Sequence, residues 1–119
     1  MISLWIGILV GAFIACALMV KFFAGAPGAT SVDVKEKIRQ GAVTIDVRTP
    51  SEYQSGHYTG AKNIPLQELQ GRLTEIGDKN KAIVIYCASG MRSAKASKIL
   101  TAAGFTDVTN AGGLSNLKP

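Results

Sequence analysis

The chain has 119 residues, 47% of them hydrophobic, which is enough for one modest domain and one additional element. The formal net charge is +5, but the basic residues are spread along the sequence without interleaved aromatic residues, so no nucleic acid partner is expected. Two cysteines, no Cys-x-x-Cys motif and a single histidine exclude a dithiol redox motif and a zinc site. We therefore expect no metal site.

The first predicted element is an apolar helix. Residues 2–20 contain no charged side chain, and a helix of about 20 such residues spans the hydrocarbon core of a bilayer. Trp5 and Lys21 would suit the two interfaces, so residues 1–23 are predicted to form a transmembrane helix. A cleaved signal peptide is the alternative, but no Lys or Arg precedes the run and Pro27 disfavours cleavage nearby.

Gly7, Gly11 and Ala15 repeat at helical spacing within this segment and could support a weak helix-mediated dimer. Small residues are also common in such helices for no particular reason. Lys21 and the cations of residues 35–39 follow the span, which predicts a single-pass protein of the inner membrane with its domain in the cytoplasm. A periplasmic domain remains the alternative.

The sequence after the apolar run predicts a linker and one α/β domain. Residues 24–29 form the linker, and residues 30–119 alternate strand and helix patterns. Strands are predicted at residues 42–47, 61–64, 82–86 and 106–109. Helices are predicted at residues 30–40, 50–55, 66–76 and 93–100, the second with a capping box that starts at Thr49. This alternation predicts a three-layer fold, a small parallel sheet covered by helices on both faces.

The loop between the third strand and its following helix carries the candidate chemistry, in the segment Cys87-Ala88-Ser89-Gly90-Met91-Arg92. Small residues at the start of a helix can direct several backbone N–H groups at one point and form an anion cradle. A cysteine there should be more acidic than a free thiol, and Arg92 adds a cation. The loop therefore predicts a thiolate nucleophile that attacks a small anionic substrate. The alternative is a buried cysteine that only fills space.

A phosphatase or arsenate-reductase type of enzyme is a second reading of this loop. Such a loop needs the spacing Cys-x5-Arg to surround a phosphate, and this sequence has Cys-x4-Arg. A tighter ring suits one sulfur atom added to Cys87 better than a whole phosphate group.

Two charged residues follow the first predicted strand. Asp46 and Arg48 lie at its carboxyl end, where open α/β sheets place their ligands, and could support the cysteine loop through hydrogen bonds. The favoured alternative is structural, with Arg48 paired to Glu52. His57 could act as a base, but a structural role is favoured there too.

Several short segments recur in an order that is typical of one family. They are Ile45-Asp46-Val47-Arg48, Glu52-Tyr53, Gly56-His57, Gly60-Ala61-Lys62-Asn63-Ile64-Pro65, Tyr86-Cys87 and Gly112-Gly113. With the Cys-x4-Arg loop, they make residues 30–119 resemble the rhodanese sulfurtransferases. One departure is that the family usually has a tryptophan where this chain has Leu117.

The resemblance implies a rhodanese-like fold and a sulfur-transfer reaction. Cys87 would take the sulfane sulfur of a small anionic donor such as thiosulfate and pass it, as a persulfide, to a thiol or cyanide acceptor. The N–H groups of residues 88–92 would bind the substrate, Ser93 would support them, and no cofactor is implied. A docking module that carries persulfide to a partner at the membrane is the alternative function.

Overall fold

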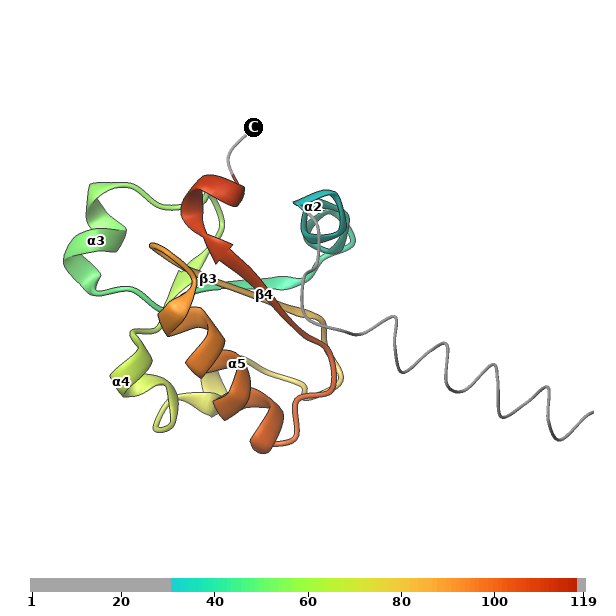
Figure 1. Cartoon of the computed structure of the whole chain (residues 1–119). Helices are drawn as coiled ribbons and strands as arrows, with labels where there is room; N and C mark the ends of the chain where they lie inside the picture. The colour runs from blue at the N-terminus through green and yellow to red at the C-terminus, as the bar shows by residue number, and fades with distance from the viewer. Residues whose placement is uncertain (1–30, 118–119) are drawn as a thin grey trace, which may run out of the picture.

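The computed structural model describes residues 31–117, which form a four-stranded parallel sheet between two layers of helices (Figure 1). The strand order is β2-β1-β3-β4, with bounds β1 Val43–Asp46, β2 Lys62–Asn63, β3 Ile83–Cys87 and β4 Val108–Gly113. The helices are α2 Ser31–Arg39, α3 Pro50–Ser55, α4 Leu66–Leu69 and α5 Met91–Ala102, with 3-10 turns η1 Leu73–Glu75 and η2 Leu114–Asn116. The predicted α/β architecture is confirmed.

The predicted membrane helix and linker, residues 1–29, lie outside the described residues. Within residues 31–117, no helix is long and apolar enough to cross a bilayer.

Strand β3 separates two hydrophobic cores, because successive side chains of a strand point to opposite faces of the sheet. Ile83, Ile85 and Cys87 pack in the core beneath α4 and α5, while Val84 and Tyr86 pack in the core beneath α2. All five residues of β3 are buried, as expected for a parallel strand covered on both faces. Each buried aliphatic side chain contributes about 1.5–3 kcal/mol, so this strand is anchored firmly up to Cys87.

The prediction of a single helix at residues 66–76 is wrong. The structure has the short helix α4, a turn and then η1 in its place. Gly71 lies in that turn, and glycine in a helix interior costs about 1 kcal/mol relative to alanine. The break still allows Leu69 and Ile76, which flank it, to be buried in the same core.

Strand β4 is longer than the predicted residues 106–109 and continues through Gly112 and Gly113. Its backbone stays paired with β3, with a register shift between Ile85 and Tyr86, so that Gly113 lies opposite Cys87. Backbone pairing therefore overrides the low strand propensity of glycine. Beyond β4, Leu117 is 1% exposed and packs in the core beneath α2, so a leucine fills the position where tryptophan was expected.

Candidate active site

Cys87 is the last residue of β3, and the loop that follows it leads directly into α5. Gly90 is the N-cap of α5 and has a φ of 104°, a left-handed conformation that glycine adopts without steric cost. The turn at Gly90 directs the first N–H groups of the 12-residue helix α5 toward the cysteine end of the loop. Ala88 and Ser89 are exposed, and Met91 is 73% exposed at the rim.

The sulfur atom of Cys87 has two close polar contacts. The backbone N–H of Gly90 donates a hydrogen bond to Sγ at 2.8 Å, and Sγ lies 3.4 Å from Oγ of Ser93. The Ser93 hydroxyl itself donates to the carbonyl of Gly90 at 3.0 Å. A thiol can donate to Ser93 Oγ, whereas a thiolate can accept from the same hydroxyl after it rotates. Ser93, predicted to be a supporting residue, is therefore in direct contact with the sulfur.

These contacts favour the thiolate. Burial by itself raises the pKa of the Cys87 thiol, but hydrogen bonds from the Ser93 side chain and from the N–H groups of Ser93, Gly90 and Ser89 together take that pKa below its ordinary value. Backbone N–H groups and a hydroxyl stabilise the negative charge on the sulfur without adding a charge of their own. The arrangement can therefore present a nucleophilic sulfur to a substrate near neutral pH.

Replacing Ser93 by alanine should make Cys87 less acidic. A hydrogen bond to a charged group contributes about 1.5–3 kcal/mol, so the midpoint of alkylation rate against pH should rise by about one to two pH units. The wild-type midpoint should lie below the value of about 8.5 for a free thiol. Ser97→Ala is the matched control, because the Ser97 hydroxyl donates to the backbone carbonyl of Ser93, one turn further along α5. An unchanged midpoint in Ser93→Ala would contradict the assignment.

Two consecutive glycines of β4 form the wall against which the cysteine loop packs. A Cβ atom on Gly113 would lie 2.6 Å from the carbonyl oxygen of Ala88, and one on Gly90 would lie 3.4 Å from Cα of Gly112. No side chain fits at the first position without displacing backbone atoms. The Gly112-Gly113 segment therefore sets how closely β4 approaches the loop.

Gly113→Ala should displace the loop and impair the site. Overpacking of this kind costs about 1–3 kcal/mol of stability, and the hydrogen bond from Gly90 to Sγ should lengthen, which raises the alkylation midpoint. Gly71→Ala is the control, since a Cβ there would meet its nearest atom at 3.8 Å. If Gly113→Ala matched the wild type in urea stability and in alkylation of Cys87, the packing argument would be wrong.

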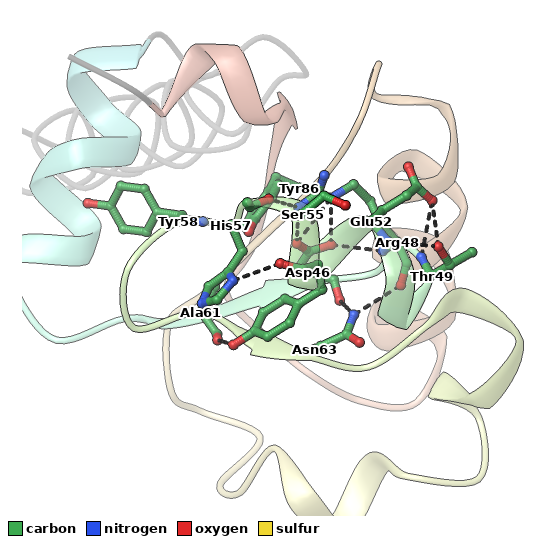
Figure 2. Close-up of polar contacts among 12 residues, drawn as sticks. Asp46, Arg48, Thr49, Glu52, Ser55, His57, Tyr58, Ala61, Asn63 and Tyr86 are labelled. Atoms are coloured by element: carbon green, nitrogen blue, oxygen red, sulfur yellow. Dashed lines mark hydrogen bonds and ion pairs between the residues drawn. The ribbon is translucent and has the colours of Figure 1, made fainter.

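Asp46 and Arg48 form a buried ion pair at the carboxyl end of β1 (Figure 2). Arg48 Nη2 lies 2.7 Å from Asp46 Oδ2, and Nε contacts both carboxylate oxygens. The same Nη2 donates to the carbonyl of Gly56 at 2.8 Å, and Asn63 donates to the carbonyls of both Asp46 and Arg48. The pair therefore ties the end of α3 to β1, while Asn63 ties β2 to the same stretch of backbone. The hydrogen bonds of the pair to described residues do not extend to the cysteine loop.

The predicted pairing of Arg48 with Glu52 is wrong. Arg48 pairs with Asp46 instead, and Glu52 binds Arg92, with Nη1 to Oε1 at 2.7 Å and Nη2 to Oε2 at 2.9 Å. These residues are 40 positions apart, and no local pattern in the sequence indicated their contact. Glu52 thereby links α3 to the cysteine loop, and the terminal nitrogens of Arg92 are engaged.

His57 and Tyr86, near the same end of the sheet, contact neighbouring tyrosines (Figure 2). His57 stacks on the ring of Tyr53 at 3.7 Å, and its Nδ1 lies 2.8 Å from the carbonyl of Tyr53. Burial raises the pKa of Tyr86 to about 12, and its hydroxyl accepts a hydrogen bond from the N–H of Tyr58. In the described part of the chain, no group of three or more His, Cys, Asp or Glu is placed to hold a metal ion.

Comparison with known proteins identifies what this geometry resembles. The model of the rhodanese-like domain family matches residues 30–118. Thiosulfate sulfurtransferase PspE of Escherichia coli (strain K12) is 47% identical over 74 residues, which cover 61% of this chain and 71% of that protein. A solved structure described as a rhodanese with anions from E. coli is 45% identical, with a TM-score of 0.61 over 64% of this chain and 91% of that one. The human single-domain sulfurtransferase TSTD1 shares the fold, with a TM-score of 0.68 at 24% identity over 78% of this chain and 95% of that one.

Proposed function

Because the chain belongs to the rhodanese-like domain family, we propose that it is a sulfurtransferase that moves a sulfane sulfur through a persulfide on Cys87. The similarity to a thiosulfate sulfurtransferase supports thiosulfate, or a small anion like it, as donor. The observation that carries the proposal is the sulfur of Cys87, held at the start of α5 by the Gly90 N–H at 2.8 Å, with a lowered pKa.

In the first step the Cys87 thiolate attacks the outer sulfur of thiosulfate. A sulfur–sulfur bond forms to Sγ, the sulfur–sulfur bond of the donor breaks, and sulfite leaves with the electron pair of that bond. The negative charge then rests on the terminal sulfur of the persulfide. The N–H groups at the start of α5 are already oriented to stabilise that charge, so little reorganisation accompanies the transfer.

In the second step an acceptor attacks the terminal sulfur. A thiolate acceptor gains the sulfur and becomes a persulfide, cyanide becomes thiocyanate, and the bonding pair returns to Cys87 as a thiolate. The enzyme ends as it began, without net oxidation or reduction. Division into two displacements at one nucleophile predicts ping-pong kinetics.

Phosphate-ester hydrolysis fits the site less well. A phosphatase loop uses its arginine to bind the phosphate oxygens, whereas both terminal nitrogens of Arg92 are occupied by Glu52. The loop is also one residue shorter than Cys-x5-Arg.

Steady-state kinetics with thiosulfate and cyanide test the proposed reaction directly. We expect parallel lines in double-reciprocal plots and no hydrolysis of an aryl phosphate at enzymatic rates. Hydrolysis of the phosphate without transfer from thiosulfate would replace the proposal with the phosphatase. A low rate with every small donor, together with stable binding to one protein, would favour a persulfide-carrying docking module.

We also propose that residues 2–20 anchor the domain to the inner membrane as a single helix, with the domain in the cytoplasm and Gly7, Gly11 and Ala15 at any weak dimer contact. The uncharged run followed by Lys21 supports this arrangement. Protease added to intact spheroplasts should leave the domain uncut, and protease added to inverted vesicles should digest it. Digestion from the outer face would indicate the periplasm instead, and recovery of the domain without residues 2–20 would indicate a cleaved signal peptide.

A further inference from the structure

We propose that Glu52 sets the anion affinity of the cysteine loop by neutralising Arg92, so that the loop recognises its donor mainly through N–H groups. This inference rests on the proposed sulfur transfer. Arg92 follows directly on the loop and is the cation expected there to attract an anionic donor. In the structure its guanidinium is paired at both terminal nitrogens with one carboxylate. Arg92 and Glu52 together therefore carry no net charge beside the cysteine loop.

Glu52 is held in place independently of Arg92. Its Oε1 accepts hydrogen bonds from the N–H of Thr49 at 3.2 Å and from the Thr49 hydroxyl at 3.1 Å (Figure 2), and Thr49 in turn caps α3 by accepting from the N–H of Glu52. The far end of α3 is held by Arg48 through the carbonyl of Gly56. The carboxylate is therefore held at the start of α3, where it binds the side chain of Arg92.

Glu52 stays negatively charged at neutral and mildly acidic pH. A hydrogen bond from Arg92 is the main cause that lowers the pKa of Glu52 to about 2. Glu52 is the main cause that raises the pKa of the Arg92 guanidinium, and the charge of Cys87 adds a smaller contribution in the same direction, so Arg92 and the sulfur interact electrostatically. About a third of each side chain is exposed, and solvent therefore limits the effect of the pair to a modest factor.

The variant Glu52→Gln distinguishes the effect of the Glu52 charge from its effect on folding. Glutamine also serves at this position of a capping box, so the start of α3 should be kept while Arg92 loses its counter-charge. We expect the KM for thiosulfate to fall by about twofold to fivefold, with no rise in kcat. Glu36→Gln is the matched control, because Glu36 pairs with Arg39 on α2 and its loss changes the net charge by the same amount. Its KM should equal that of the wild type.

A second measurement does not depend on turnover. Sulfate should protect Cys87 from the neutral reagent iodoacetamide at a concentration about twofold to fivefold lower in Glu52→Gln than in the wild type. Glu52→Asp keeps the charge but weakens the cap, so it should restore the wild-type KM and sulfate protection even if its melting temperature falls.

Equal KM and equal sulfate protection in Glu52→Gln and the wild type would overturn the inference. So would anion affinities that follow melting temperature across the Gln and Asp variants, since Glu52 would then act through the fold alone. A wild type that transfers no sulfur would instead remove the proposed function, while the sulfate measurement would still test the role of Glu52. If Glu52→Gln does not fold, wild-type values in Glu52→Asp support the inference and altered values contradict it.

Discussion

Cys87→Ser is expected to abolish sulfur transfer while leaving the domain folded. Serine is close in size to cysteine, but its hydroxyl is far less nucleophilic toward sulfur and stays protonated near neutral pH. We expect turnover with thiosulfate and cyanide to fall by at least about a thousandfold, because the removed group is the proposed nucleophile for both steps. The side chain is 0% exposed and packs in the core beneath α5, so some loss of stability should accompany the change.

The melting temperature separates these two effects. If Cys87→Ser melts cooperatively well above the assay temperature and turns over normally, the nucleophile has been assigned to the wrong residue. Ser97→Ala, which alters a hydroxyl on α5 bonded to the carbonyl of Ser93, should keep most of the activity and serves as the control.

Arg48→Met is expected to produce the largest loss of stability. The side chain of Asp46 is 0% exposed and that of Arg48 is 9% exposed, so the substitution leaves a buried carboxylate without its cation. Removal of one partner of a buried ion pair costs about 3–5 kcal/mol. Gly56 also loses the donor to its carbonyl, so the end of α3 should loosen. Urea unfolding at neutral pH would measure the change in the free energy of unfolding.

Arg39→Met provides the comparison. Arg39 pairs with Glu36 on the surface and its side chain is 77% exposed, so its loss should leave the free energy of unfolding almost unchanged. Adding Asp46→Val to Arg48→Met should recover much of the lost stability, because the unpaired charge is then removed as well. A cost below about 1 kcal/mol for Arg48→Met alone would show that the pair does not anchor this end of the sheet.

The elements that could be predicted are those whose formation depends on residues close to one another in the sequence. The buried run before Cys87, the capping box at Thr49 and the alternation of strands with helices all have local causes, and all three appear in the structure. The prediction of one helix at residues 66–76 was wrong because the apolar residues have the same spacing whether the helix continues through Gly71 or ends before it. The continuation of β4 through Gly113 was not predicted from the sequence, because it depends on pairing with β3.

The features of the site were likewise predictable where their causes are local and not predictable where they depend on distant residues. The cysteine loop and the contact of Ser93 with the sulfur follow from a short segment in which strand, glycine and helix are consecutive. The partners of charged side chains were not predictable, since Arg48 had two carboxylates within four residues and Glu52 bound a cation 40 positions away. Packing geometry selects among such partners, and a single sequence does not contain it.

In the proposed reaction Cys87 carries the transferred sulfur, and the mass of the intact protein shows whether it does. After incubation with thiosulfate and removal of excess donor, the wild type should gain the mass of one sulfur atom, and cyanide should remove it as thiocyanate. Fragmentation should place the added sulfur on Cys87, and Cys87→Ser should gain nothing. A wild type that stays unmodified while it turns over thiosulfate, or a sulfur retained by Cys87→Ser, would show that Cys87 is not the sulfur carrier.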